Sequence, residues 1–359
     1  MTDLKHHYDS APPAESQQST MQGFDSEFAD LVDYILRITY RIWEGKQIGL
    51  IYDYYSEDCP VYTLAGLSRG AETVVQNTLN TLAAFPDRTL HAENVIWSGD
   101  DQDEYFSSHR IRTHMTNLGP SEFGPATGKH AVIQVIAHCV VKNNQVIREW
   151  LVRDNYSLAV QLGFEPHEVA KNWAQTPLNS EFETWRQQEI ERISQQITTA
   201  RQPFTGNAEE SPEAFIHATL QNIWNARMVG DVCYAYAENA TLNASGERSL
   251  NGHQEIIRFY MQFLGTLSNL RVAVDHVCCQ PCGDHGVDIA VRWTLAGQHT
   301  GLSLYGPPTG APILILGESH YRIVDGVIEE EWTIFDELSV LTQIYRARAA
   351  TGLKSDNPE

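Results

Sequence analysis

The sequence lacks long apolar runs and has little basic charge. No stretch approaches the roughly 20 consecutive apolar residues that a transmembrane helix needs, so we expect no association with a membrane. Only 25 Lys and Arg residues stand against 46 Asp and Glu residues, which gives a formal net charge of −21, and no basic stripe reverses this charge locally. Because such a charge repels phosphate backbones, nucleic acid is not an expected partner.

Cysteine is also scarce, and no export signal is visible. Six cysteines in 359 residues follow no regular framework spacing. The segment Met1–Met21 lacks the apolar core and the small-residue cleavage pattern of a secretory signal. Both absences favour a reducing compartment, and we expect a cytoplasmic protein. The polar composition of this segment predicts a disordered tail over residues 1–23.

An internal repeat is the most informative feature that is present. The length suits two domains, each large enough to bury a core. Shifting the sequence against itself by 182 positions aligns matching residues of two copies. The matches are Arg110 with Arg292, Gly128 with Gly310, His138 with His320, Trp150 with Trp332, and Asp154 with Asp336. The chain therefore reads as one domain used twice.

Each copy begins with helical periodicity and continues with strand periodicity. We expect helices over 71–82 and 254–264, and strands over 95–97, 105–114, 131–141 and 146–153, with the same order in the second copy. Asn143-Asn144 and Asp325-Gly326 fall where a tight hairpin needs residues that tolerate positive φ. This order predicts an α+β fold in which helices cover one face of a curved, mostly antiparallel sheet and leave a pocket between them.

The domain boundaries follow from composition. We expect domains over 24–164 and 211–348, a helical linker over 165–210 and a C-terminal tail over 349–359. The linker contains a polar helix around 182–197, followed by Pro203, Gly206 and Asn207, which is more typical of a connector than of a core.

The end of each copy resembles the SnoaL-like polyketide cyclase family of the nuclear transport factor 2-like superfamily. Copy two has Arg322-Ile323, Asp325-Gly326, Ile328, Trp332 and Asp336, then Leu341 and Gln343. Copy one keeps Val146-Ile147, Trp150, Asp154 and Gln161-Leu162-Gly163. The resemblance implies two cone-shaped domains and chemistry on a small hydrophobic carbonyl compound without an organic cofactor.

The chain departs from the family pattern at the position of the acid–base aspartate. The resemblance places it directly after the Trp, where this chain has Leu151 and Thr333, and neither side chain moves a proton at neutral pH. The family's assisting histidine aligns with Ser319, one residue before His320, and a shift of one residue on a strand turns a side chain to the other face.

Other residues could supply acid–base chemistry. His138 and His320 interrupt apolar strands, and Asp154 and Asp336 are their candidate partners. The alternative is that each histidine is a satisfied structural residue and that each aspartate caps the helix that follows it.

Two arginines are candidates for oxyanion support. Arg110 and Arg292 lie mid-strand, where a guanidinium could hold a carboxylate or enolate oxygen. Internal ion pairs, with Glu149 or Glu331 as partners, are the alternative. Further residues expected to line the pocket are Tyr55, Trp150, Tyr236, Trp332, Glu318 and Glu331, although ordinary core and rim packing also explains the tyrosines.

Copy two alone contains a Cys/His cluster. His276, Cys279, Cys282 and His285 recur at three-residue intervals, a spacing that could close around zinc. The second spaced pair that marks a strong zinc motif is missing, and a Cys-rich turn is the alternative. We therefore expect no metal.

Two functions remain open at this stage. One is an enzyme that acts by proton transfer, such as a cyclase, isomerase or dehydratase, on a small hydrophobic molecule. The other is a non-catalytic binding or scaffold protein built as an intramolecular pseudo-dimer, which would be a monomer with internal pseudo-twofold symmetry or a homodimer. The sequence names neither a substrate nor the copy that acts.

Overall fold

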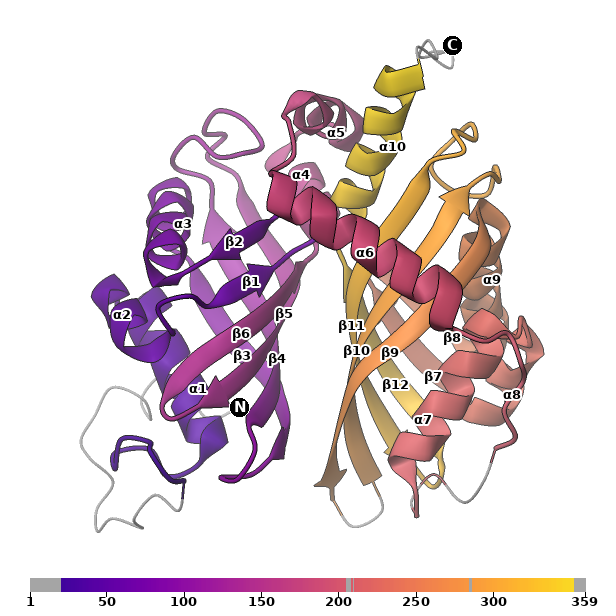
Figure 1. Ribbon diagram of the computed structural model, residues 1–359, viewed down its shortest axis with the longest axis horizontal. Helices are drawn as coiled ribbons and strands as arrows, with labels where there is room; N and C mark the ends of the chain where they lie inside the picture. The colour runs from indigo at the N-terminus through magenta and orange to yellow at the C-terminus, as the bar shows by residue number, and fades with distance from the viewer. Residues whose placement is uncertain (1–20, 205–207, 209, 284–285, 352–359) are drawn as a thin grey trace. The chain divides into compact units, whose positions relative to one another are not determined.

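The computed structural model describes residues 21–204, 208, 210–283 and 286–351 (Figure 1). Most of the two expected tails, and His285 of the Cys/His cluster, therefore lie outside the described residues. By the contacts between residues, the chain divides into two units. Unit 1 comprises residues up to Tyr62 and Ser68–Leu151, and unit 2 comprises Thr63–Leu67 and Val152 onward. The domain boundaries expected from composition stay a prediction.

The first copy contains helices α1 (Leu31–Thr39), α2 (Ile51–Tyr54), α3 (Ala71–Ala84) and α4 (Asn155–Leu162). Its sheet has six strands in the order β2-β1-β6-β5-β4-β3. They are β1 (Pro60–Tyr62), β2 (Leu67–Arg69), β3 (Thr89–Gly99), β4 (Tyr105–Thr116), β5 (His130–Lys142) and β6 (Gln145–Arg153). β1 runs parallel to β6, whereas β3, β4 and β5 pair antiparallel.

The second copy repeats this order. Its helices are α7 (Pro212–Leu220), α8 (Val232–Ala235), α9 (Gly252–Thr266) and α10 (Glu337–Thr351). The sheet order β8-β7-β12-β11-β10-β9 matches that of the first copy strand for strand. The strands are β7 (Tyr236–Ala244), β8 (Arg248–Asn251), β9 (Leu267–Cys282), β10 (Gly286–His299), β11 (Pro312–Val324) and β12 (Val327–Phe335). The α+β prediction with two tandem copies is confirmed.

Hairpins join the last two strands of each copy as expected. Asn143 and Asn144 have φ of 48° and 66°, and Asp325 and Gly326 have φ of 48° and 82°. Two successive residues in the left-handed region form the tight turn whose twist matches that of the flanking strands. These hairpins fix the register of β5 with β6 and of β11 with β12, and so decide which side chains share a face.

The apolar core of unit 1 lies between the helices and one face of its sheet. Phe28, Tyr34 and Ile38 belong to a buried cluster that also contains Cys139 of β5 and Tyr105 of β4. The α1 hydrophobic residues recur at helical spacing and are buried, which is why this segment forms an amphipathic helix against the sheet.

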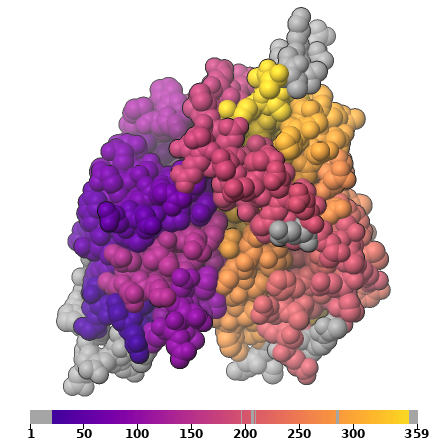
Figure 2. Space-filling view, in the orientation of Figure 1, coloured from indigo at the N-terminus to yellow at the C-terminus, as the bar shows by residue number. Residues whose placement is uncertain are grey.

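Between the copies lie α5 (Pro166–Gln175) and α6 (Ser180–Gln196). Helix α6 begins at an Asn179 cap, whose side chain accepts a hydrogen bond from the Glu181 backbone. It crosses β9, β10 and β11 (Figure 1) and is exposed on the outside of that sheet (Figure 2). Ile193 is fully buried there against Ala273, Ala296 and Leu314. The segment expected to connect the copies therefore also covers the second sheet.

Candidate active site

The second sheet has two distinct faces. Directly paired residues on neighbouring strands share a face, and Tyr321 pairs with Glu331 while Ser319 pairs with Thr333. Tyr260 of α9 hydrogen-bonds Glu331, so this is the face that α9 covers. The residues that pack on α6 belong to the opposite face, because strand neighbours alternate.

A hydrogen-bonded network of buried side chains occupies the face under α9. The Tyr236 hydroxyl donates to Glu331 Oε2 at 2.6 Å and lies 2.7 Å from the Tyr260 hydroxyl, which is itself 3.3 Å from Glu331 Oε2. The Thr333 hydroxyl donates to Glu331 Oε1. On its other side Thr333 lies 2.8 Å from the Ser319 hydroxyl, which accepts from the Trp293 indole at 2.9 Å. We call these six residues the Glu331 network.

Burial changes how this network titrates. Glu331 is 1% exposed, and removal from water raises its pKa above the usual value of a glutamate, although the surrounding hydroxyl donors oppose the rise. Burial also raises the pKa of Tyr236 and Tyr260 well above the usual tyrosine value, with the Glu331 charge adding to the rise. The tyrosines therefore remain hydroxyl donors, while the pKa of the Glu331 carboxyl is raised in the direction of neutral pH.

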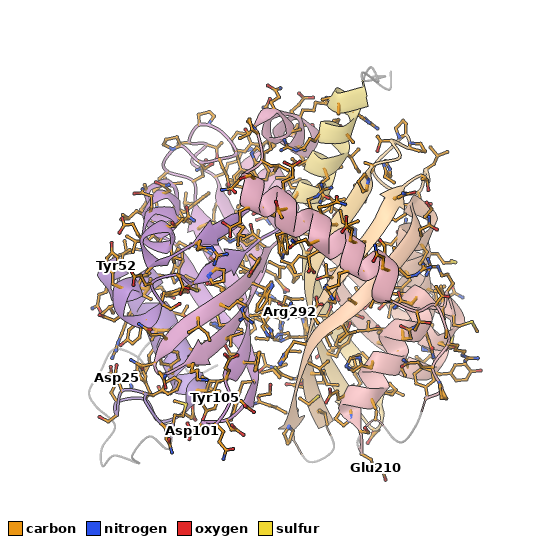
Figure 3. The ribbon with its side chains drawn as sticks, in the orientation of Figure 1. Asp25, Tyr52, Asp101, Tyr105, Glu210 and Arg292 are labelled. Atoms are coloured by element: carbon orange, nitrogen blue, oxygen red, sulfur yellow. The ribbon has the colours of Figure 1, made fainter. Side chains whose placement is uncertain are left out.

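The histidine of the second copy lies on the opposite face. His320 pairs with Trp332, and Arg292 pairs with Glu318, so these four candidates share the α6 side of the sheet. Figure 3 labels Arg292 on β10. Of the residues expected to serve the second site, only Tyr236 and Glu331 lie in the network under α9. Alternation along each strand causes this separation, since Glu331 and Trp332 are neighbours in sequence.

The first copy repeats this separation. Tyr55 donates a hydrogen bond to Glu149 at 3.1 Å, as Tyr236 does to Glu331. His138 instead packs edge-on against Trp150, with ring centroids 5.9 Å apart, and Trp150 stacks on Tyr62. Because Glu149 and Trp150 are sequence neighbours on β6, the histidine and the Tyr55–Glu149 pair belong to opposite faces.

The two aspartates form helix caps. Asp154 accepts hydrogen bonds from the Ser157 backbone at 3.1 Å and the Ser157 hydroxyl at 2.5 Å, and from the Gly246 backbone at 2.9 Å. Asp336 makes the same two bonds to Ser339. These bonds fit the capping alternative. Burial raises the pKa of Asp154 to about 6.

The register also separates His320 from its expected partner. Phe335, the residue before Asp336, pairs with Gly317, three positions along β11 from His320. At the strand rise of about 3.3 Å per residue, roughly 10 Å separates these two backbone positions. In the first copy His138 belongs to unit 1 and Asp154 to unit 2. The catalytic roles expected for these pairs stay predictions.

Both arginines form internal ion pairs, but with partners that the sequence did not suggest. Arg110 contacts Glu93 at 2.6 Å, and Arg292 lies 3.6 Å from Asp275. The register of each outer strand pair shifts at these acidic residues, so each carboxylate sits at a β-bulge. Glu149 and Glu331, the partners considered from the sequence, are on the other face of their sheets.

Three residues of the Cys/His cluster, His276, Cys279 and Cys282, lie on the extended strand β9. β9 continues through Cys282, where Cys279 pairs with Ile289 and Cys282 with Gly286. Residues three apart on a strand point to opposite faces, so Cys279 and Cys282 do not converge on one ion. Among the described residues no group of three or more His, Cys, Asp or Glu side chains is placed to hold a metal.

Sequence reasoning missed four members of the network: Tyr260, Trp293, Ser319 and Thr333. Two of them stand at the positions where the resemblance had placed the family's histidine and aspartate. Ser319 and Thr333 lie on the Glu331 face and hydrogen-bond each other. The alternation of Glu331 and Thr333 along one strand was the signal available in the sequence.

None of the described helices is both long and apolar enough to cross a membrane. Among curated proteins none matches the chain. Several solved structures resemble about one copy each, all at low identity. The wild-type IdmH structure, a putative polyketide cyclase from Streptomyces antibioticus, is 20% identical over 37% of this chain and 97% of that one, with a TM-score of 0.32.

A putative SnoaL-like polyketide cyclase from Jannaschia Sp. CCS1 is 17% identical over 41% of this chain and 96% of that one, with a TM-score of 0.33. AclR, a putative hydroxylase from Streptomyces galilaeus, is 21% identical over 36% and 92% of the two chains, with a TM-score of 0.32. The family model described as SnoaL-like polyketide cyclase matches residues 34–162 and again 215–344, together more than half of the chain. The chain therefore belongs to the SnoaL-like polyketide cyclase family, with two tandem copies of its domain.

Proposed function

We propose that the second copy catalyses proton transfer on a small hydrophobic carbonyl compound, without an organic cofactor, and that Glu331 is the group that moves the proton. The observation that carries the proposal is the buried carboxyl of Glu331, held by two tyrosine hydroxyls and the Thr333 hydroxyl on the helix-covered face. A carboxyl whose pKa is raised by burial is matched to acid–base work near neutral pH.

The neighbouring donors suit the charge that such a reaction develops. When a base removes a proton beside a carbonyl group, negative charge forms on the carbonyl oxygen and must be held by hydrogen-bond donors. Tyr236 and Tyr260 stay protonated because burial raises their pKa values. Once Glu331 has taken the proton and become neutral, these hydroxyls are free to donate to the enolate oxygen. One buried cluster thus supplies both the base and the oxyanion support.

The network also supports a role for Glu331 in place of the family's aspartate. Thr333 occupies the aspartate position and donates to Glu331, and Ser319 occupies the histidine position and contacts Thr333. Neither hydroxyl titrates near neutral pH, but each fixes its neighbour in one orientation. The acid–base function is therefore proposed to lie two residues earlier on the same face of β12.

The test is exchange of the α-protons of neutral aryl ketones and β-keto esters of increasing size in D2O, followed by NMR. We expect the protein to accelerate exchange and Glu331→Gln to reduce it by about 10²- to 10⁴-fold, the usual contribution of a positioned acid–base group. The rate should rise with pH through the raised pKa of Glu331, since the base form acts. Failure to exchange any member of the panel, or full activity in Glu331→Gln, contradicts the proposal.

The matched control is Glu149→Gln. Glu149 is the equivalent carboxylate of the first copy and contacts Tyr55, but Leu151 and Cys139 stand where the second copy has Thr333 and Tyr321. The exchange rate of this variant should equal that of the parent protein. The alternative function, binding without catalysis, predicts instead that both variants bind the ketones and that neither changes the exchange rate.

A further inference from the structure

Strand β4 of the first copy places two polar side chains in the core, and the second copy has no polar residues at the equivalent positions. Ser107 is 0% exposed and His109 is 4% exposed. The register assigns them clear counterparts: Ser107 pairs with Cys139, as Ile289 pairs with Tyr321. By the same shift His109 corresponds to Val291. The second copy therefore has two apolar residues at these positions, and the fold itself does not require polar ones.

Both side chains belong to the face under the helices. Tyr105, two residues before Ser107 on the same strand, lies in the buried cluster with the α1 side chains, and so does Cys139, the partner of Ser107. Alternation along β4 places Ser107 and His109 on that same face. They therefore project into the layer between sheet and helices, where the second copy has its Glu331 network.

The two groups are not satisfied by the protein. Within the described part of the chain, Ser107 Oγ and His109 Nε2 are buried and have no hydrogen-bond partner. A buried polar atom left without a partner costs about 1–3 kcal/mol. Two such atoms on adjacent positions of one face, where apolar residues would fit, indicate a partner that is not part of the protein.

The chemistry of the partner follows from the neighbours. Burial lowers the pKa of His109 to about 4, so the imidazole is neutral at physiological pH. The carboxyl of Glu149, which accepts a hydrogen bond from Tyr55, already occupies this core, so a neutral partner fits beside it better than a second acid. The side chains of residues two apart on a strand are separated by about 6.6 Å. Two hydrogen bonds of about 2.8 Å reach about 5.6 Å, so a single hydroxyl group, which both donates and accepts, bridges the pair when the longer imidazole leans towards Ser107.

We propose that the core of the first copy is a binding site for a small neutral molecule with a hydroxyl group, such as a phenol, held between Ser107 and His109. This site is separate from the Glu331 network and does not depend on the function proposed for it. The first copy would then bind, and the second would catalyse.

The test uses the full-length chain with 15N-labelled histidine, titrated with phenol and with toluene, which has a similar shape but no hydroxyl. Phenol should shift the ring nitrogen resonances of His109 and bind about tenfold tighter than toluene, as expected for one hydrogen bond to a buried group. A phenol affinity equal to that of toluene, or unchanged His109 resonances at saturating phenol, overturns the proposal and leaves ordered water as the partner.

The matched variant is Ser107→Ile combined with His109→Val, which introduces the residues of the second copy. It should lower phenol affinity to that of toluene, whereas Glu331→Gln should leave phenol affinity at His109 unchanged. His109→Gln, which keeps a polar nitrogen near the Nε2 position, should retain most of the affinity and serves if the double variant does not fold. Phenol binding by the double variant at parental affinity contradicts the assignment.

Discussion

The pKa values of two buried side chains, one in each core, are shifted in opposite directions by the same cause. Burial lowers the pKa of His109 to about 4 and raises that of Glu331, because removal from water penalises the charged form of each. Each residue is therefore biased towards its uncharged state. For His109 this gives a polar but neutral side chain, and for Glu331 it suits the proton transfer proposed above.

The pKa of His109 makes stability depend on pH. Its folded pKa of about 4 lies below the unfolded value of about 6.5, so the unfolded chain binds the proton more readily. The contribution of His109 to the free energy of unfolding is fully present above pH 6.5, and it falls by up to about 3 kcal/mol as the pH drops to 4. We expect His109→Val to flatten this part of the curve in urea unfolding followed between pH 7 and pH 4. Equal slopes in the two proteins would show that His109 is not buried neutral.

Gly317 is fixed by the indole of Trp293. A Cβ atom added at Gly317 would lie 2.1 Å from a ring carbon of Trp293, which is itself held by its bond to Ser319. Because neither can move without breaking the Glu331 network, we expect Gly317→Ala to destabilise the protein by about 1–3 kcal/mol or more. Gly230→Ala is the control, since nothing lies within 4 Å of its added Cβ. Thermal unfolding of both variants measures the difference in stability, and the rate of α-proton exchange of the ketones shows whether the Glu331 network is still intact.

At the scale of elements, α6 shows how a polar helix becomes part of a core. Most of its residues are exposed, but Phe182 and Ile193 are buried, and Arg192 forms an ion pair with Asp275 at 2.8 Å. Asp275 is the bulge residue of β9 that also faces Arg292. The helix is therefore attached to the sheet by the apolar contacts of Ile193 and by the ion pair with Asp275, the bulge residue.

Ile193→Ala tests this attachment. Truncating a fully buried isoleucine removes apolar contacts and leaves a cavity, so we expect a loss of about 2–5 kcal/mol. Gln188→Ala, on the exposed side of the same helix, should change stability by less than about 0.5 kcal/mol. Hydrogen exchange should show faster exchange of the α6 amides in Ile193→Ala. Unchanged protection of α6 would mean that the helix does not depend on this contact.

At the scale of the whole molecule, the charge is strongly unbalanced. A net charge of −21 in 359 residues repels itself in the compact state and lowers stability, while it favours solubility. Raising the salt concentration shortens the range of this repulsion to about 3 Å at 1 M. We expect urea midpoints to rise between 0.05 and 0.5 M NaCl. A falling midpoint would show that the ion pairs of the bulges outweigh the general repulsion.

The divergence of the two copies is also a property of the whole chain. The shared shift of 182 positions maps Glu149 onto Glu331, and each hydrogen-bonds a tyrosine that follows the second helix of its copy. The other polar groups of the two cores differ, however: hydroxyls and an indole in the second copy, and Ser107, His109 and the thiols of Cys59 and Cys139 in the first. One fold thus carries two different polar cores.

The repeat, the element order and both hairpins followed from the sequence alone. Periodicity and turn chemistry are local properties, so the strands over 105–114 and 131–141 and the Asn143-Asn144 turn could be predicted. The face of each strand that meets the helices could not. The bulges at Glu93 and Asp275 shift the register between strands, so alternation within one strand does not transfer to its neighbour.

The sequence by itself therefore determined the family, the duplication and the chemistry-bearing residue types, because these depend on order along the chain. Tertiary structure decided which of those residues meet. It placed His320 and Arg292 on the face of the sheet that points away from Glu331. It also gathered Tyr260, Ser319 and Trp293 around that carboxyl from three separate elements. Contacts between residues distant in sequence depend on strand register and helix packing, which no local pattern specifies.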